Sequence, residues 1–214
     1  VTIRNNPKLA RLDGLAPVDA IDRSPSTEEL PTEYEESANA QCVPTGSSDD
    51  GPSGALRIVN NDRLDSLPAL ALQSVQGELV IRDNDRLEDL SGFFSLTEVE
   101  GGLEIAANAA LQRIQGFRQL EEVDGALDVT GNEKLRRLEG FVRLGSIEGS
   151  LRIEDNRALR TVAGFDELDS TGRVVLRNTP VTDLDGLARF QNPIKDSIEV
   201  LAKAGGAKGV QHGQ

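Results

Sequence analysis

Two carboxylates occupy equivalent positions in neighbouring sequence repeats and could do chemistry together. Glu104 and Asp128 are 24 residues apart, and each is the middle residue of a Leu-x-Ile or Leu-x-Val unit. If such units stack as parallel strands, the two side chains lie about 4.8 Å apart. Retaining glycosidases use two carboxyl groups about 5 Å apart, and Arg82 and Arg152 would flank this pair. Three interpretations stay open: a glycan-active enzyme, charge pairing on a solvated sheet, and part of a recognition surface.

The acidic sequence "RDND" around Asn84 suggests a second kind of chemistry. Asp83 and Asp85 could supply oxygen ligands to Ca²⁺, which takes six to eight of them. In the next repeat, however, their equivalents are Ala107 and Ala109. Without an acidic ladder, these residues indicate an acidic turn rather than a calcium site.

Nucleophilic and metal chemistry lack their usual residues. His212, the single histidine, stands near the end of the chain, and Cys42 is the single cysteine. Neither has a partner at a spacing typical of a catalytic pair or a zinc site. The sequence therefore predicts no catalytic residues, no metal and no cofactor.

The charge of the chain limits its partners. The net charge is −13, whereas binding to nucleic acid or anionic lipid needs a basic surface. Residues 22–53 contribute −7 of this charge, because they hold eight carboxylates and Arg23. No apolar run reaches the roughly 18 to 20 residues of a membrane span. We expect no nucleic-acid partner and no direct membrane insertion. Because the chain opens in the middle of its repeat pattern, we also expect a processed or trimmed chain.

A 24-residue repeat would position these side chains. The Leu-x-Ile unit alternates as a strand does, with two side chains pointing inward and the middle one outward. A coil cannot cover its apolar face alone, so identical neighbours must cover it. Seven copies of the unit begin at Val1, Leu56, Leu79, Leu103, Leu127, Leu151 and Val174.

The rest of each copy is apolar at every third position, as from Leu87 to Val99. In a helix, steps of three residues lag by about 60° each, so they make no single buried stripe. Glycines such as Gly92 within the segment also disfavour a helix, by roughly 1 kcal/mol relative to alanine. We expect these glycines to allow positive φ at corners. The pattern predicts an all-β parallel solenoid of about seven coils.

Two further columns of the repeat predict internal ladders. A side-chain amide after each strand could bond the backbone of neighbouring coils, and a phenylalanine in each of four copies could stack on the next. The ladder residues are Asn6, Asn61, Asn84, Asn108, Asn132, Asn156, Phe93, Phe117, Phe141 and Phe165. By contrast, the outward strand positions vary, and their candidate binding residues are Arg82, Glu104, Asp128, Thr130, Arg152, Glu154 and Arg177.

The repeat "G-x-L-x-I-x-x-N-x-x-L-x-x-L-x-G-F-x-x-L-x-x-V-x-G" resembles the receptor L-domain type of leucine-rich repeat over residues 1–21 and 54 to about 190. It departs from the common leucine-rich pattern at Asn84-x-x-Leu87 and lacks a helical segment. The resemblance implies a right-handed β-solenoid used for extracellular or surface recognition, and it carries over no catalytic residues.

Three segments complete the predicted organisation. Residues 1–190 form a single solenoid that an acidic loop at 22–53 interrupts. Residues 191–206 form a helix that caps the last coil, because Ile194, Ile198 and Leu201 follow Pro193 at helical spacing. Residues 207–214 form a flexible tail.

These observations favour a non-enzymatic recognition protein, extracellular or at the cell surface. It would bind a protein or glycan through the strand face and the acidic loop. One alternative is a subunit of a surface assembly that self-associates through its open N-terminal coil. The other is a glycan-active enzyme that uses Glu104 and Asp128.

Overall fold

The computed structural model describes residues 2–4, 20–21, 54–187 and 198–201. The predicted acidic loop at 22–53, Asn6 and the predicted tail at 207–214 lie outside this part of the chain.

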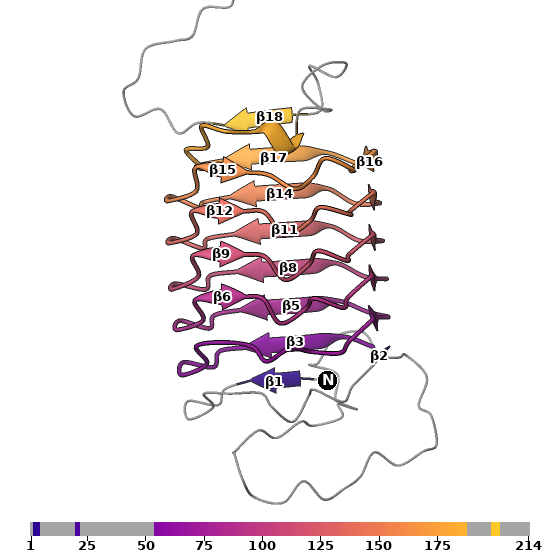
Figure 1. The fold of residues 1–214 in the computed structure, drawn as a ribbon. Helices are drawn as coiled ribbons and strands as arrows, with labels where there is room; N and C mark the ends of the chain where they lie inside the picture. The colour runs from indigo at the N-terminus through magenta and orange to yellow at the C-terminus, as the bar shows by residue number, and fades with distance from the viewer. Residues whose placement is uncertain (1, 5–19, 22–53, 188–197, 202–214) are drawn as a thin grey trace, which may run out of the picture.

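Three parallel sheets wrap around one core, and each coil contributes a strand to each sheet in most of the described chain (Figure 1). Sheet A carries the Leu-x-Ile strands, in the order β1 (Thr2–Arg4), β3 (Leu56–Val59), β5 (Leu79–Arg82), β8 (Leu103–Ala106), β11 (Leu127–Thr130), β14 (Leu151–Glu154), β17 (Val174–Arg177) and β18 (Ile198–Leu201). Sheet B contains β2 (Ala20–Ile21), β4 (Ser74–Val75), β7 (Glu98–Val99), β10 (Glu122–Val123), β13 (Ser146–Ile147) and β16 (Ser170–Thr171). Sheet C contains β6 (Asp89–Leu90), β9 (Arg113–Ile114), β12 (Arg137–Leu138) and β15 (Thr161–Val162).

The apolar residues spaced by three thus belong to short extended pieces, and the all-β parallel solenoid is confirmed. Successive sheet A strands from β3 to β17 enclose five complete turns. The described residues therefore do not confirm a count of about seven coils.

The predicted capping helix at 191–206 is wrong where the structure describes it. Residues Ile198–Leu201 form β18, which pairs in parallel with β17 and places Ile198 beside Val174 and Val200 beside Leu176. The helical spacing of Ile194, Ile198 and Leu201 competes with a second pattern, because Ile198 follows Val174 by the same 24 residues that separate earlier strands. The unit Ile198-x-Val200 is another copy of Leu-x-Ile, and strand pairing prevails over the local helical pattern.

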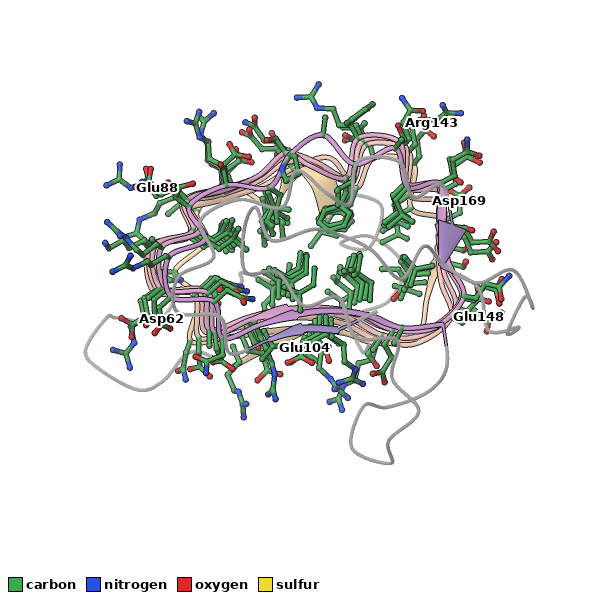
Figure 2. All side chains as sticks on the ribbon, turned by 90° about the horizontal axis from the view of Figure 1, so that it is seen from below. Asp62, Glu88, Glu104, Arg143, Glu148 and Asp169 are labelled. Carbon is green, nitrogen blue, oxygen red and sulfur yellow. The ribbon has the colours of Figure 1, made fainter. Side chains whose placement is uncertain are left out.

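Stacked aliphatic and aromatic columns fill the interior, as the view along the solenoid shows (Figure 2). Phe93, Phe117, Phe141 and Phe165 are fully buried, and their ring centroids are 5.1, 5.3 and 5.2 Å apart in nearly parallel planes. Stacking at this distance follows from the strand spacing, since each ring repeats once per coil.

The repeated glycines mainly allow the backbones of adjacent coils to approach closely, and most of them do not have a positive φ. Among Gly92, Gly116, Gly140 and Gly164, only Gly164 has a positive φ, of 81°. A Cβ on Gly116 would lie 2.2 Å from the Leu90 carbonyl oxygen of the preceding coil. The expectation of positive φ at these glycines is therefore wrong for three of the four positions.

Positive φ occurs instead at the residue that follows each sheet A strand from β3 to β17. Asp83, Ala107, Gly131 and Asp155 have φ values of 56°, 52°, 65° and 55°. Asp tolerates this left-handed conformation better than most residues do, because its short polar side chain can bond locally. The turn geometry thus accounts for Asp83 in "RDND".

The five described asparagines of the ladder are fully buried and bonded to one another. The Oδ1 atom of Asn108 accepts hydrogen bonds from the backbone N–H of Asn84 at 3.1 Å and from its Nδ2 at 3.2 Å. The Nδ2 atom of Asn108 donates to the Ile81 carbonyl at 2.9 Å. Each amide therefore satisfies backbone groups of the preceding coil that the turn would leave unpaired.

Replacing Asn108 by alanine should lower the free energy of unfolding by about 2 to 4 kcal/mol, because the Asn84 N–H and the Ile81 carbonyl lose their partners in a buried site. Chemical denaturation followed by circular dichroism measures this loss. Gln112→Ala, at an exposed position of the same coil, is the control and should change stability little. Equal stability of both variants would contradict a structural role for the ladder.

Replacing Gly116 by alanine should destabilise the fold by at least about 2 kcal/mol, because the new methyl group would overlap the Leu90 carbonyl. Gly145→Ala is a matched control, since a Cβ there would meet its nearest atom, the Glu121 carbonyl oxygen, at 3.8 Å. We expect the control to be neutral or slightly stabilising. Thermal denaturation compares the two variants, and similar losses in both would refute the close-approach explanation.

Candidate functional site on the outer face of sheet A

The strand register of sheet A places the predicted surface residues in two adjacent columns. One column runs through Arg57, Val80, Glu104, Asp128, Arg152 and Val175, and the next through Val59, Arg82, Ala106, Thr130, Glu154 and Arg177. Asp128 is the direct neighbour of Glu104 on one side and of Arg152 on the other. The spacing of 24 residues therefore brings together the two carboxylates that the sequence singled out, and Figure 2 shows Glu104 on the outside of this sheet.

Ion pairs connect neighbouring strands across this face. Arg152 lies 3.6 Å from Asp128, and Arg57 lies 2.5 Å from Glu78. Arg177 pairs with Glu154. Each of these pairs keeps one side chain exposed to solvent, and pairs at the surface contribute little to stability, typically below about 1 kcal/mol. Their main effect is to fix the positions of long side chains on a rigid sheet.

Glu104 differs from the other carboxylates of the face. It is partly buried, and it forms no ion pair within 4 Å with any residue that the structure describes. Burial raises the pKa of Glu104 above its ordinary value, Arg82 opposes the rise, and Asp128 adds to it. Glu104 therefore lacks the direct ion pair that Asp128 has, and Arg82 offsets only part of the effect of burial.

Asp128 is also partly buried, and only one of its carboxylate oxygens faces a cation. Burial raises the pKa of Asp128, Arg152 opposes this, and Glu154 adds to it. Its Oδ1 atom is inaccessible to solvent and has no hydrogen-bond partner in the described structure. Of the two carboxyls, Glu104 is therefore the one that has no ion pair and can accept a hydrogen bond from an incoming donor. Raised pKa values would also suit a general acid, so the interpretation as a glycan-active enzyme stays a prediction.

Two of the acids of the turns have partners within the protein. The Asp155 carboxylate accepts a hydrogen bond from Asn178 at 2.6 Å, and Asp83 lies 3.7 Å from Arg82. Among the described residues, no group of three or more His, Cys, Asp or Glu side chains is arranged to hold a metal ion. The same residues include no helix of the length and hydropathy needed to cross a membrane.

Sequence reasoning missed a second charged surface, on sheet C. Register pairs Arg113 with Arg137, and Arg136 and Arg160 occupy the preceding column of successive coils. These arginines also recur at 24 residues. A comparison of every polar position of the repeat at this 24-residue spacing, and not only of the strand positions, would have identified them.

Comparisons with known proteins agree with the architecture. Residues 72–171 match the family model described as Receptor L domain. Comparison with curated proteins gave no match, and comparison with solved structures gave none. Receptor L domains in general bind protein ligands, are non-enzymatic and are typically extracellular. The match and the parallel solenoid together support an L-domain-like repeat family and a binding or recognition role in general.

Replacing Glu104 by glutamine should stabilise the protein at pH 7. A carboxyl whose pKa is raised by folding favours the folded state when protonated and penalises it when charged. The gain should therefore shrink as the pH falls towards the ordinary carboxyl pKa of 4.5 and vanish below it. Urea denaturation at several pH values measures the difference. A gain that persists at low pH, or a loss at pH 7, would contradict the assigned cause.

Proposed function

We propose, from the L-domain-like repeat that residues 72–171 form, that this protein is a non-enzymatic recognition scaffold outside the cell or at its surface. Its main contact is the outer face of sheet A, and its partner is a protein. Residues 22–53 supply a second, acidic contact.

The contrast between the two sides of sheet A carries this proposal. Inward positions repeat almost unchanged, as Leu79, Leu103, Leu127 and Leu151 do, and they are buried. Outward positions that keep solvent exposure change from coil to coil, from Asp128 to Arg152 and from Thr130 to Glu154. Packing constrains the inner columns, whereas a partner is free to select the outer ones. A rigid sheet with varied outward residues is how repeat proteins present binding surfaces.

The charges of the face indicate the partner's chemistry. Arg152 and Arg177 are already paired with carboxylates of the protein itself, whereas the partly buried Glu104 has no such ion pair among the described residues. A basic side chain of the partner would neutralise Glu104. Such charge-assisted hydrogen bonds contribute strongly to specificity when they exclude water.

Replacing Glu104 by lysine should disrupt this contact, because it reverses the charge that the partner binds. The inward apolar residues of the strand stay unchanged. We expect the amount of partner captured from an extract of the native cell surface to fall by at least about tenfold. Quantitative pull-down with the purified protein as bait measures the effect. Deleting residues 22–53 should also weaken capture.

Glu167→Lys is the matched control, since it makes the same charge change at an exposed position away from sheet A. Circular dichroism verifies that both variants fold. Equal capture by the parent protein, Glu104→Lys and Glu167→Lys would refute the assignment of the binding face to sheet A.

A further inference from the structure

The side of the solenoid formed by sheet C concentrates positive charge on a strongly acidic protein. Arg113, Arg136, Arg137 and Arg160 come from three successive coils and are all exposed. In Figure 2, the label Glu88 marks this side of the solenoid. Glu88 directly precedes β6 and lies across the core from Glu104. We call these four residues the arginine patch.

Like charges adjoin one another in the patch. Arg113 and Arg137 are register neighbours, and the Arg160 N–H donates to the Arg136 carbonyl at 3.0 Å, which fixes those two residues on adjacent coils. Like charges facing each other on neighbouring strands destabilise a sheet. Arg137 is paired with Glu139 at 3.0 Å. Within the described part of the chain, the side chains of Arg113, Arg136 and Arg160 pair with no carboxylate.

A hollow provides a place for a ligand beside these arginines. Arg136, Arg137, Ala158, Arg160 and Thr161 line an open depression of about 510 Å³. Guanidinium groups present planar forks of N–H donors that match carboxylate and sulfate oxygens in pairs, and the Thr161 hydroxyl can add another hydrogen bond.

Acidic residues set the length of the patch. Asp89 is the register neighbour of Arg113 at one end, and Asp183 is bridged to Thr161 at the other. The arginines span two coil steps, or about 10 Å along the axis. A long nucleic acid would meet acidic surface beyond that length, whereas a ligand with a few closely spaced anionic groups would not. At physiological salt, repulsion from distant carboxylates is screened beyond about 8 Å.

The patch lacks the anchors of a protein interface. Such interfaces usually depend on aromatic or aliphatic side chains at their centre. The large exposed hydrophobic residues of the described chain are Phe94 and Val142, which lie outside sheet C. Sugar rings that carry anionic groups, by contrast, need mainly polar contacts.

We propose that the arginine patch is a binding site for an acidic oligosaccharide, whose sulfate or carboxylate groups occupy the hollow beside Arg136, Arg137 and Arg160. This site is distinct from the face of sheet A and takes a different class of ligand. Its loss should therefore leave capture of the protein partner unchanged, so the two proposals can fail separately.

Isothermal titration calorimetry with the whole chain at 0.15 M salt tests the site. The probes are a sulfated hexasaccharide, a galacturonate hexasaccharide and a neutral hexasaccharide of equal length. We expect one or both acidic probes to bind and the neutral one not to. The double variant Arg136→Gln and Arg160→Gln should weaken binding at least about tenfold, because it removes two guanidinium forks.

The matched control removes the same charge elsewhere, with Arg86→Gln and Arg118→Gln at exposed positions outside the patch. It should bind within about twofold of the parent. Arg136→Lys and Arg160→Lys together keep the charge but lose the forks, and should bind more weakly than the parent. Equal losses in the control and patch variants, or no binding of either acidic probe, would overturn the proposal. Tighter binding of a hexaglutamate peptide than of both glycans would overturn it as well.

Discussion

The buried asparagine amides hold the coils of this protein in register. Each of the four from Asn84 to Asn156 accepts hydrogen bonds from the coil before it and donates to a carbonyl in that coil. A slip of one residue would bury unpaired N–H and carbonyl groups, at a cost of about 1 to 3 kcal/mol each. The register in turn stacks Phe93 on Phe117 and places Asp128 beside Glu104. The surface columns exist because the internal amides allow one alignment.

The tight approach of adjacent coils is the second constraint, and it depends on glycine. A Cβ at Gly101 or Gly125 would lie 2.6 Å from backbone atoms of the coil before it. Only glycine therefore fits at these positions, whereas the outward positions of sheets A and C carry several different residue types. The two kinds of position explain how one repeat supports a mixed-charge face on sheet A and a basic face on sheet C. The scaffold thus determines which positions can carry a charged side chain, but it does not determine whether that charge is positive or negative.

Much of this architecture could be predicted from the sequence, because side chains that meet in space recur at one interval. The asparagine and phenylalanine columns and the Glu104–Asp128 pair follow directly from the 24-residue spacing. β18 could not be recognised as easily, because Lys203 stands where the asparagine column would continue and the helical spacing from Ile194 obscures the unit at Ile198. The positive φ at Asp83 and Ala107 depends on turn geometry, which residue type alone does not reveal. The arginine patch was missed because each arginine, taken singly, is an ordinary exposed residue.

The solenoid also has mechanical consequences. β1 and β18 lie at opposite ends of the stack (Figure 1), so a force applied between them acts along the axis, parallel to the hydrogen bonds that join the coils. Such a force opens the bonds of one coil at a time instead of shearing many together. Each released repeat of 24 residues would add roughly 80 Å of extended chain. A protein built in this way would lengthen in steps under load, one coil after another, while the remaining coils keep their surfaces.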